Sequence, residues 1–155
     1  MAIALNDDEA AVSVAMVAMR ERGGETFVVV GTVKDMTLHP RMHKGGFVHV
    51  YRLIETKLTL LHSTPVDDVP GAIVGFGGRA LISVGKVLRI YDLGKRKLLR
   101  KAENKSFPTF ITNIRVYGER IYVSDMQESF HLCKYKRLEN QVGGVFCACV
   151  MRAAE

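Results

Sequence analysis

Apolar residues recur at every second position along much of this chain, and glycine-containing turns separate the alternating runs. Residues 47–53 and 87–91 show the pattern well, because aliphatic side chains alternate there with aromatic or charged ones. A period of two is typical of β-strands whose two faces meet different surroundings. The predicted strands are 9–19, 25–34, 46–53, 57–63, 69–76, 79–84, 86–92, 96–102, 109–117, 119–124 and 128–136.

The first of these segments is also compatible with a helix. Ala and Met dominate residues 10–19, and an amphipathic helix would suit them nearly as well. The spacing of Val12 and Val14 favours a strand, so a strand is predicted here.

Two segments of the chain resemble each other. Residues 76–85 and 116–125 each contain an apolar residue, a glycine turn, an arginine and a short strand that ends near a serine. Their separation is about the 40 residues of one four-stranded propeller blade. This spacing favours a propeller over the sandwich or barrel that short, evenly spaced strands also allow. The predicted fold class is therefore all-β: a partial β-propeller of about two to three four-stranded antiparallel blades, which cannot close a ring on its own.

The character of the chain changes towards its C-terminus. Residues 142–151 lack the charged side chains that punctuate every earlier strand. We therefore expect a partial β-propeller region at 1–141 and a divergent C-terminal tail at 142–155. No Pro/Ser-rich linker or low-complexity tract divides the first region.

Composition excludes several classes of protein. Hydrophobic residues make up 48% and charged residues 25% of the chain, which is the balance of a folded domain rather than a disordered one. Three cysteines without a Cys-x-x-Cys pair favour a reducing compartment. No apolar run reaches the roughly 18 residues of a membrane-spanning helix. Asp7, Asp8 and Glu9 stand where a secretory signal would carry Lys or Arg, so export is not expected.

Residues that could carry chemistry are scattered. Asp67 and Asp68 are adjacent, so on a strand they would point to opposite faces and could not flank one bond. His39 and His43 are four residues apart, but Pro40 disfavours the helix that would bring them together. The two cysteines of residues 147–149 are too close for a standard zinc half-site. We therefore predict no catalytic, cofactor-binding or metal site, and no enzyme.

Charge is concentrated in one part of the chain. Residues 86–105 contain eight basic and two acidic residues, a net charge of +6, whereas the rest of the chain is balanced. Such a hairpin could contact RNA phosphates or an acidic protein. The charges could instead protect an edge strand from pairing with another chain. Direct nucleic-acid contact is less favoured than protein contact or plain solvation, because no stacking aromatics alternate with the charges. The candidate partner- or RNA-binding residues are Lys95, Arg96, Lys97, Arg100 and Lys101.

Specific runs of residues resemble one known family. The first run is residues 85–101, which contain Tyr-Asp-Leu-Gly-Lys at 91–95. Two further runs follow it: Glu-Asn-Lys at 103–105 and Val-Ser-Asp-Met-Gln-Glu-Ser-Phe at 123–130. These runs resemble subunit three of splicing factor 3b, the large triple-propeller subunit of the branch-site-recognising ribonucleoprotein. That family belongs to the superfamily of the cleavage and polyadenylation specificity factor A subunit, as does the large subunit of the damage-specific DNA-binding protein.

The resemblance implies a scaffold without catalytic residues or cofactors. The family's propellers hold the helical-repeat subunit and the small subunits of the same complex, in the nucleus, near RNA and away from membranes. The chain would correspond to blades of the third propeller, and hence to a fragment of the family's full length. The resemblance ends at Gln141, so we expect residues 142–155 to derive from a retained intron, a frameshift or a truncated gene model rather than from the family.

Overall fold

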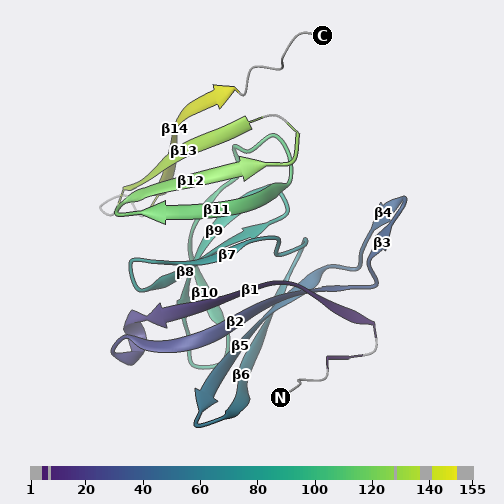
Figure 1. Ribbon diagram of the computed structural model, residues 1–155, viewed down its shortest axis with the longest axis vertical. Helices are drawn as coiled ribbons and strands as arrows, with labels where there is room; N and C mark the ends of the chain where they lie inside the picture. Colours follow the sequence, from purple (N-terminus) through teal and green to yellow (C-terminus); the bar gives the residue numbers. More distant parts are fainter. Residues whose placement is uncertain (1–4, 7, 128, 137–140, 150–155) are drawn as a thin grey trace.

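The structure, a computed structural model, describes residues 5, 6, 8–127, 129–136 and 141–149; for residues 129, 141 and 143–149 it describes the backbone only. Within this part of the chain, three four-stranded antiparallel sheets follow one another along the sequence (Figure 1). A small two-stranded hairpin and a short 3-10 helix lie between strands of the first sheet. The fold is therefore all-β, as predicted.

The first sheet consists of β1 (Glu9–Met19), β2 (Glu25–Lys34), β5 (Gly46–Ile54) and β6 (Lys57–Val66). The second consists of β7 (Ile73–Phe76), β8 (Arg79–Val84), β9 (Val87–Leu93) and β10 (Leu98–Asn104). The third consists of β11 (Ile111–Tyr117), β12 (Arg120–Asp125), β13 (Ser129–Lys136) and β14 (Gln141–Cys149). The 3-10 helix η1 (Arg20–Arg22) follows β1, and β3 (Thr37–Leu38) and β4 (Arg41–Met42) form the small hairpin between β2 and β5.

The strands of each sheet lie side by side in chain order, except that the small hairpin is inserted between β2 and β5. The first strand of each sheet contacts the first strand of the next, so β1 lies against β7 and β7 against β11. In Figure 1 the three sheets are stacked along the long axis of the molecule. This is the arrangement of consecutive propeller blades around part of a ring, and the ring is open. The predicted partial β-propeller is confirmed.

The middle sheet is covered on both faces. Ala80, Ile82 and Val84 on β8 pack in the core shared with the first sheet. Leu81 on the same strand, with Leu88 and Ile90 on β9, packs in the core shared with the third sheet. A strand buried on both sides needs apolar residues at odd and even positions alike, which explains the nearly continuous apolar run of β8.

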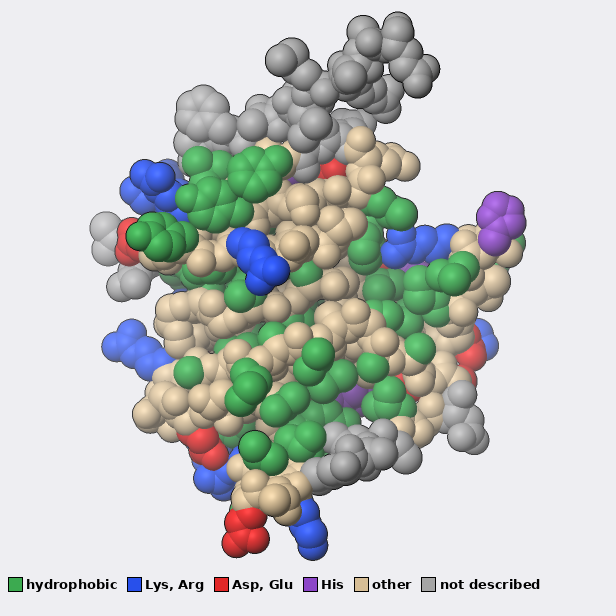
Figure 2. All heavy atoms as spheres, in the orientation of Figure 1, with side chains coloured by type: hydrophobic (Ala, Val, Ile, Leu, Met, Phe, Trp, Pro, Cys, Tyr) green, Lys and Arg blue, Asp and Glu red, His purple; other side chains and the backbone are tan. Residues whose placement is uncertain are grey.

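The first and third sheets each have one open face. Val14 and Met16 on β1 are 69% and 68% exposed, while Val17 and Met19 on the opposite face of the strand are buried. On the third sheet, Phe130 is 40% exposed. Figure 2 shows hydrophobic side chains spread over both of these sheets on the visible face of the molecule. Alternation thus separates a buried from an open face: the open face of the first sheet carries Val14 and Met16, whereas that of the third sheet mixes Phe130 with charged residues such as Arg120 and Lys134.

Three strands were not predicted. β3 and β4 are only two residues each, too short to show a period. β14 pairs along β13 from Gln141 to Cys149, although its sequence lacks the alternation of charged and apolar residues. Backbone hydrogen bonds hold such an edge strand whatever its side chains are. The expected boundary between 141 and 142 therefore falls at the start of β14; residues 150–155 lie outside the described part of the chain.

The segment predicted as a strand at 69–76 begins as a crossing linker. Residues 67–72 carry the chain from β6 at the edge of the first sheet to β7, the first strand of the second. The linker is held by backbone hydrogen bonds from Gly85 N to Val69 O (2.9 Å) and from Ser83 N to Ala72 O (2.9 Å). The Ser13 hydroxyl donates to Pro70 O across to the first sheet. Pro70 cannot donate to a sheet ladder, which is why the strand starts only at Ile73.

Candidate interaction surface

The charge-rich residues 86–105 form the antiparallel pair β9–β10, and β10 is the edge strand of the middle sheet. The connection between them is closed by a hydrogen bond from Gly94 N to Lys97 O at 3.1 Å. A Cβ on residue 94 would lie 2.3 Å from that same oxygen, so the tight turn requires glycine. The turn presents Lys95, Arg96 and Lys97 to solvent; these three residues are called the basic turn below.

The structure separates the five candidate binding residues into two groups. Among the described residues, no carboxylate pairs with a side chain of the basic turn. Arg100 instead pairs with Glu103 at 2.9 Å, and Lys101 Nζ lies 3.6 Å from Asp92 Oδ2. The basic turn and Lys86, at the start of this segment, therefore carry the charge that no carboxylate of the described residues compensates.

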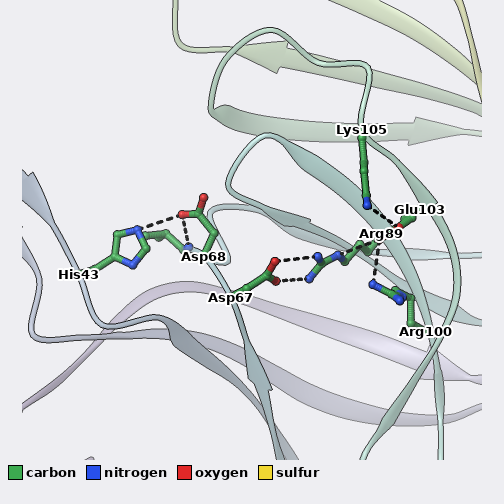
Figure 3. A network of polar contacts seen from close by, with 8 residues as sticks. His43, Asp67, Asp68, Arg89, Arg100, Glu103 and Lys105 are labelled. Atoms are coloured by element: carbon green, nitrogen blue, oxygen red, sulfur yellow. Dashed lines mark hydrogen bonds and ion pairs between the residues drawn. The ribbon is translucent and has the colours of Figure 1, made fainter.

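Arg89 is the least exposed of the basic residues in this hairpin and anchors a network of ion pairs (Figure 3). Its guanidinium donates a bidentate pair of hydrogen bonds to Asp67, with Nη1–Oδ1 at 2.6 Å and Nη2–Oδ2 at 3.1 Å. Glu103 lies 3.5 Å from Arg89 Nε and also pairs with Lys105 at 3.1 Å. Hydrogen bonding from Arg89 holds the pKa of Asp67 below its usual value. The network ties the crossing linker to β9 and neutralises part of the charge of the hairpin.

The sequence excluded Asp67 and Asp68 as a pair of catalytic carboxylates. In the structure, Asp68 accepts a hydrogen bond from Val69 N at 2.7 Å and lies 3.1 Å from His43 Nε2. Each aspartate therefore has a structural partner, and the two carboxylates serve different contacts. The partner of Asp67 is 22 residues away in the sequence, so local patterns carried no signal of it.

We predict that Asp67→Asn destabilises the chain in a pH-dependent way. Because the folded-state pKa of Asp67 is depressed, its ion pair adds stability above the ordinary pKa of 3.8, and this is lost as the pH falls through the lowered value. The variant should be less stable at pH 7 by about 1 kcal/mol, since Asp67 is largely exposed to screening solvent. Thermal melts from pH 7 down to pH ~2 should show the difference shrinking below 3.8. The control Glu55→Gln should show no such trend, and a pH-independent difference would contradict the ion-pair explanation.

A buried polar cluster on the first sheet was not anticipated from the sequence. His49 Nε2 lies 2.6 Å from Glu9 Oε1 and 3.2 Å from the Thr32 hydroxyl, and Thr32 also donates a short hydrogen bond to Glu9. In a catalytic triad the hydroxyl and the carboxylate contact different nitrogens of the histidine. Here both contact Nε2, and Nδ1 has no partner within the described residues. The cluster therefore joins β1, β2 and β5 but does not have triad geometry.

The remaining candidate groups show no arrangement for chemistry. Cys133 is a buried free thiol whose pKa is raised to about 11 by burial. The side chains of Cys147 and Cys149 lie outside the described part of the chain. In the described part, no three His, Cys, Asp or Glu side chains gather as metal ligands, and no helix has the length and apolar character to cross a membrane.

Three consecutive blades with adjoining first strands define the class of the protein, a β-propeller of which this chain forms an open part. Comparison with known proteins identifies the family within this class. Residues 1–143 match the family described as the CPSF A subunit region, and the chain belongs to this family.

Several similar proteins carry names from pre-mRNA splicing. The chain is 50% identical over 142 residues to splicing factor 3B subunit 3 of Danio rerio. It is 52% identical over 141 residues to spliceosome-associated protein 130 A of Arabidopsis thaliana, and 48% identical over 140 residues to a pre-mRNA-splicing factor of Mycosarcoma maydis. These matches cover 89–90% of the chain but only 12% of each relative. The resemblance to subunit three of splicing factor 3b is confirmed, and the origin of residues 142–155 stays a prediction.

Proposed function

We propose that this chain is a non-enzymatic scaffold segment of the spliceosomal complex that recognises the branch site, and that it acts through protein–protein contacts in the nucleus. The single observation that carries the proposal is the 50% identity to splicing factor 3B subunit 3 along nearly the whole propeller segment. The partners would be the helical-repeat subunit and the small subunits of splicing factor 3b. The rigid sheets and the charged hairpin suit a surface that holds other proteins in position.

Affinity purification of the tagged gene product from its organism tests the proposal. We expect splicing factor 3b subunits among the recovered proteins. Recovery of polyadenylation or ubiquitin-ligase subunits without splicing subunits would move the chain to one of the paralogous scaffolds of the superfamily, which act in mRNA 3′-end processing and DNA-damage recognition.

Direct RNA binding is a second candidate function, and the uncompensated charge of the basic turn favours it. Lys95, Arg96 and Lys97 lie next to one another in an exposed turn and could approach successive phosphates. Arg100 and Lys101 could join them, although both already face a carboxylate. The ion pairs of these two residues suggest that the basic turn would contribute most of the binding.

We predict that replacing Lys95, Arg96 and Lys97 together by Gln weakens RNA binding more than replacing Arg100 and Lys101. Loss of three phosphate contacts should make the slope of log affinity against log salt shallower by about 2 to 3. Fluorescence polarisation with a labelled oligouridylate over a salt series measures both quantities. Absence of binding by the unmodified chain at low salt would contradict direct RNA contact.

A further inference from the structure

A pocket of about 370 Å³ lies between the second and third sheets, at the end of the molecule where several turns meet. Its lining comes from all three blades: Arg20 from η1, Phe76 and Arg79 from the second sheet, and Glu119 and Tyr135 from the third. Lys101 of β10 completes the basic part of the lining. The turns between β1 and β2, β7 and β8, and β11 and β12 lie together on the left of Figure 1.

Arg79 is held rigidly in this pocket. Its Nε lies 2.8 Å from the buried carboxylate of Asp92, and its Nη1 donates to the Tyr135 hydroxyl at 2.9 Å. These contacts join the two sheets and fix the plane of the guanidinium. A guanidinium has five N–H donors, and these two contacts use two of them. Arg79 can therefore offer further donors to a bound group without rearrangement.

The electrostatic balance of the pocket favours an anion. Arg20, Arg79 and Lys101 contribute three positive charges, whereas Asp92 behind them and Glu119 at the lining contribute two negative ones. No carboxylate among the described residues pairs with Arg20. The backbone of Arg20 is fixed by a hydrogen bond from its N–H to Gly78 O at 2.8 Å. An exposed guanidinium on a fixed backbone segment beside a pocket is suited to capture a carboxylate.

One wall of the pocket is aromatic. The rings of Phe76 and Tyr135 pack edge to face, with centroids 5.6 Å apart, and both residues are largely buried. A phosphodiester backbone is bound best by cations spread along an open track. Here the cations converge on one cavity that has an apolar wall and the carboxylate of Glu119. This combination fits a single acidic side chain with an apolar neighbour better than it fits RNA.

We propose that this inter-sheet pocket is a docking site for an acidic peptide segment of a protein partner, in which a Glu or Asp side chain enters beside an apolar residue. The carboxylate would accept hydrogen bonds from Arg79 and Arg20 near Lys101, and the apolar neighbour would contact the wall of Phe76 and Tyr135. The inference rests on the proposed scaffold function, because it names the chemistry by which one partner would be held.

Peptide binding to the immobilised full chain tests the proposal. The probe is a fluorescent peptide in which Glu alternates with Phe, compared with the same peptide carrying Gln in place of Glu and with a labelled oligouridylate. We expect the Glu peptide to bind about tenfold or more tightly than the Gln peptide, as for a hydrogen bond to a charged group. Arg20→Ala and Lys101→Gln should each weaken the binding of the Glu peptide several-fold, and Arg20→Lys should recover part of the lost affinity.

The matched control is Lys57→Ala, which removes an exposed charge at the β5–β6 turn, outside the pocket lining, and should leave binding unchanged. Equal affinity for the Glu and Gln peptides, or no effect of Arg20→Ala and Lys101→Gln, would overturn the proposal. So would oligouridylate binding that depends on Arg20 and Lys101 more strongly than peptide binding does. If the unmodified chain recovers splicing subunits and both pocket variants recover them equally, the pocket proposal fails while the scaffold function stands.

Discussion

Expressed alone, the chain is expected to self-associate rather than to remain a monomer. Its first and third sheets expose apolar side chains on their open faces, represented by Val14 and Met16 on β1 and by Tyr117 and Phe130 on the third sheet. In a closed propeller each such face packs against the next blade, whereas here both ends of the stack are open. Exposed apolar patches and unpaired edges drive association. Size-exclusion chromatography with light scattering should therefore show oligomers or aggregates.

The open face of the first sheet can be tested directly. Val14→Lys with Met16→Lys places two charges on it and should shift the distribution strongly towards smaller species. Leu38→Lys is the control, because Leu38 is also largely exposed but lies on the small β3–β4 hairpin. A monodisperse, cooperatively melting monomer of the unmodified chain would contradict this prediction. We also expect the apolar residues 145–151 to aggravate association, although their side chains lie outside the described part of the chain.

The largest effects on stability are expected from the middle sheet. Leu81 and Ile82 are neighbours on β8, fully buried, and belong to different cores: Leu81 faces the third sheet and Ile82 the first. Leu81→Ala and Ile82→Ala should each lower the free energy of unfolding by about 3 kcal/mol, within the range of about 2–5 kcal/mol for such truncations. Each change leaves a cavity between two sheets. Strand pairing within each sheet keeps the backbone from collapsing into this cavity.

Urea denaturation at low protein concentration measures the effect. For a slope of about 1–3 kcal/mol/M the midpoint of each variant should fall by about 1 M or more. Ile54→Ala is the control; Ile54 is half exposed at the end of β5, and its truncation should change the free energy by less than about 0.5 kcal/mol. If Leu81→Ala destabilised no more than Ile54→Ala, the third sheet could not be packed on the second as described.

The strands could be predicted because their signal is local. Residues 25–34 and 79–84 were predicted with the bounds that the structure has, since apolar runs between glycine turns are typical of strands. The blade-length repeat was also informative: the matching segments form the hairpins β7–β8 and β11–β12, which occupy the same place in successive sheets. The bounds failed at 69–72, where Pro70 cannot donate to a sheet ladder and hydrogen bonds to the neighbouring β8–β9 hairpin set the path of the chain.

The candidate surface could be predicted only in part. The sequence showed that charge is concentrated at residues 86–105, but not that Arg89 is buried against Asp67 while Lys95 stays exposed. Nor did it show that Lys101 would share a pocket with Arg20, which belongs to the preceding blade. Counting charged residues along a sequence gives the total charge of a segment. The distribution of that charge over the surfaces of the molecule depends on which strand faces which sheet.

By itself, then, the sequence determined the all-β class, the blade length, the family and the location of the excess charge, because each of these is written in short-range periodicity or in residue identity. The tertiary structure decided which charges are compensated, which apolar faces stay open, and that Arg20, Arg79 and Tyr135 meet at one pocket. These features join residues from different sheets. They depend on how the blades twist and stack around a common axis, a long-range property that no local pattern of residues records.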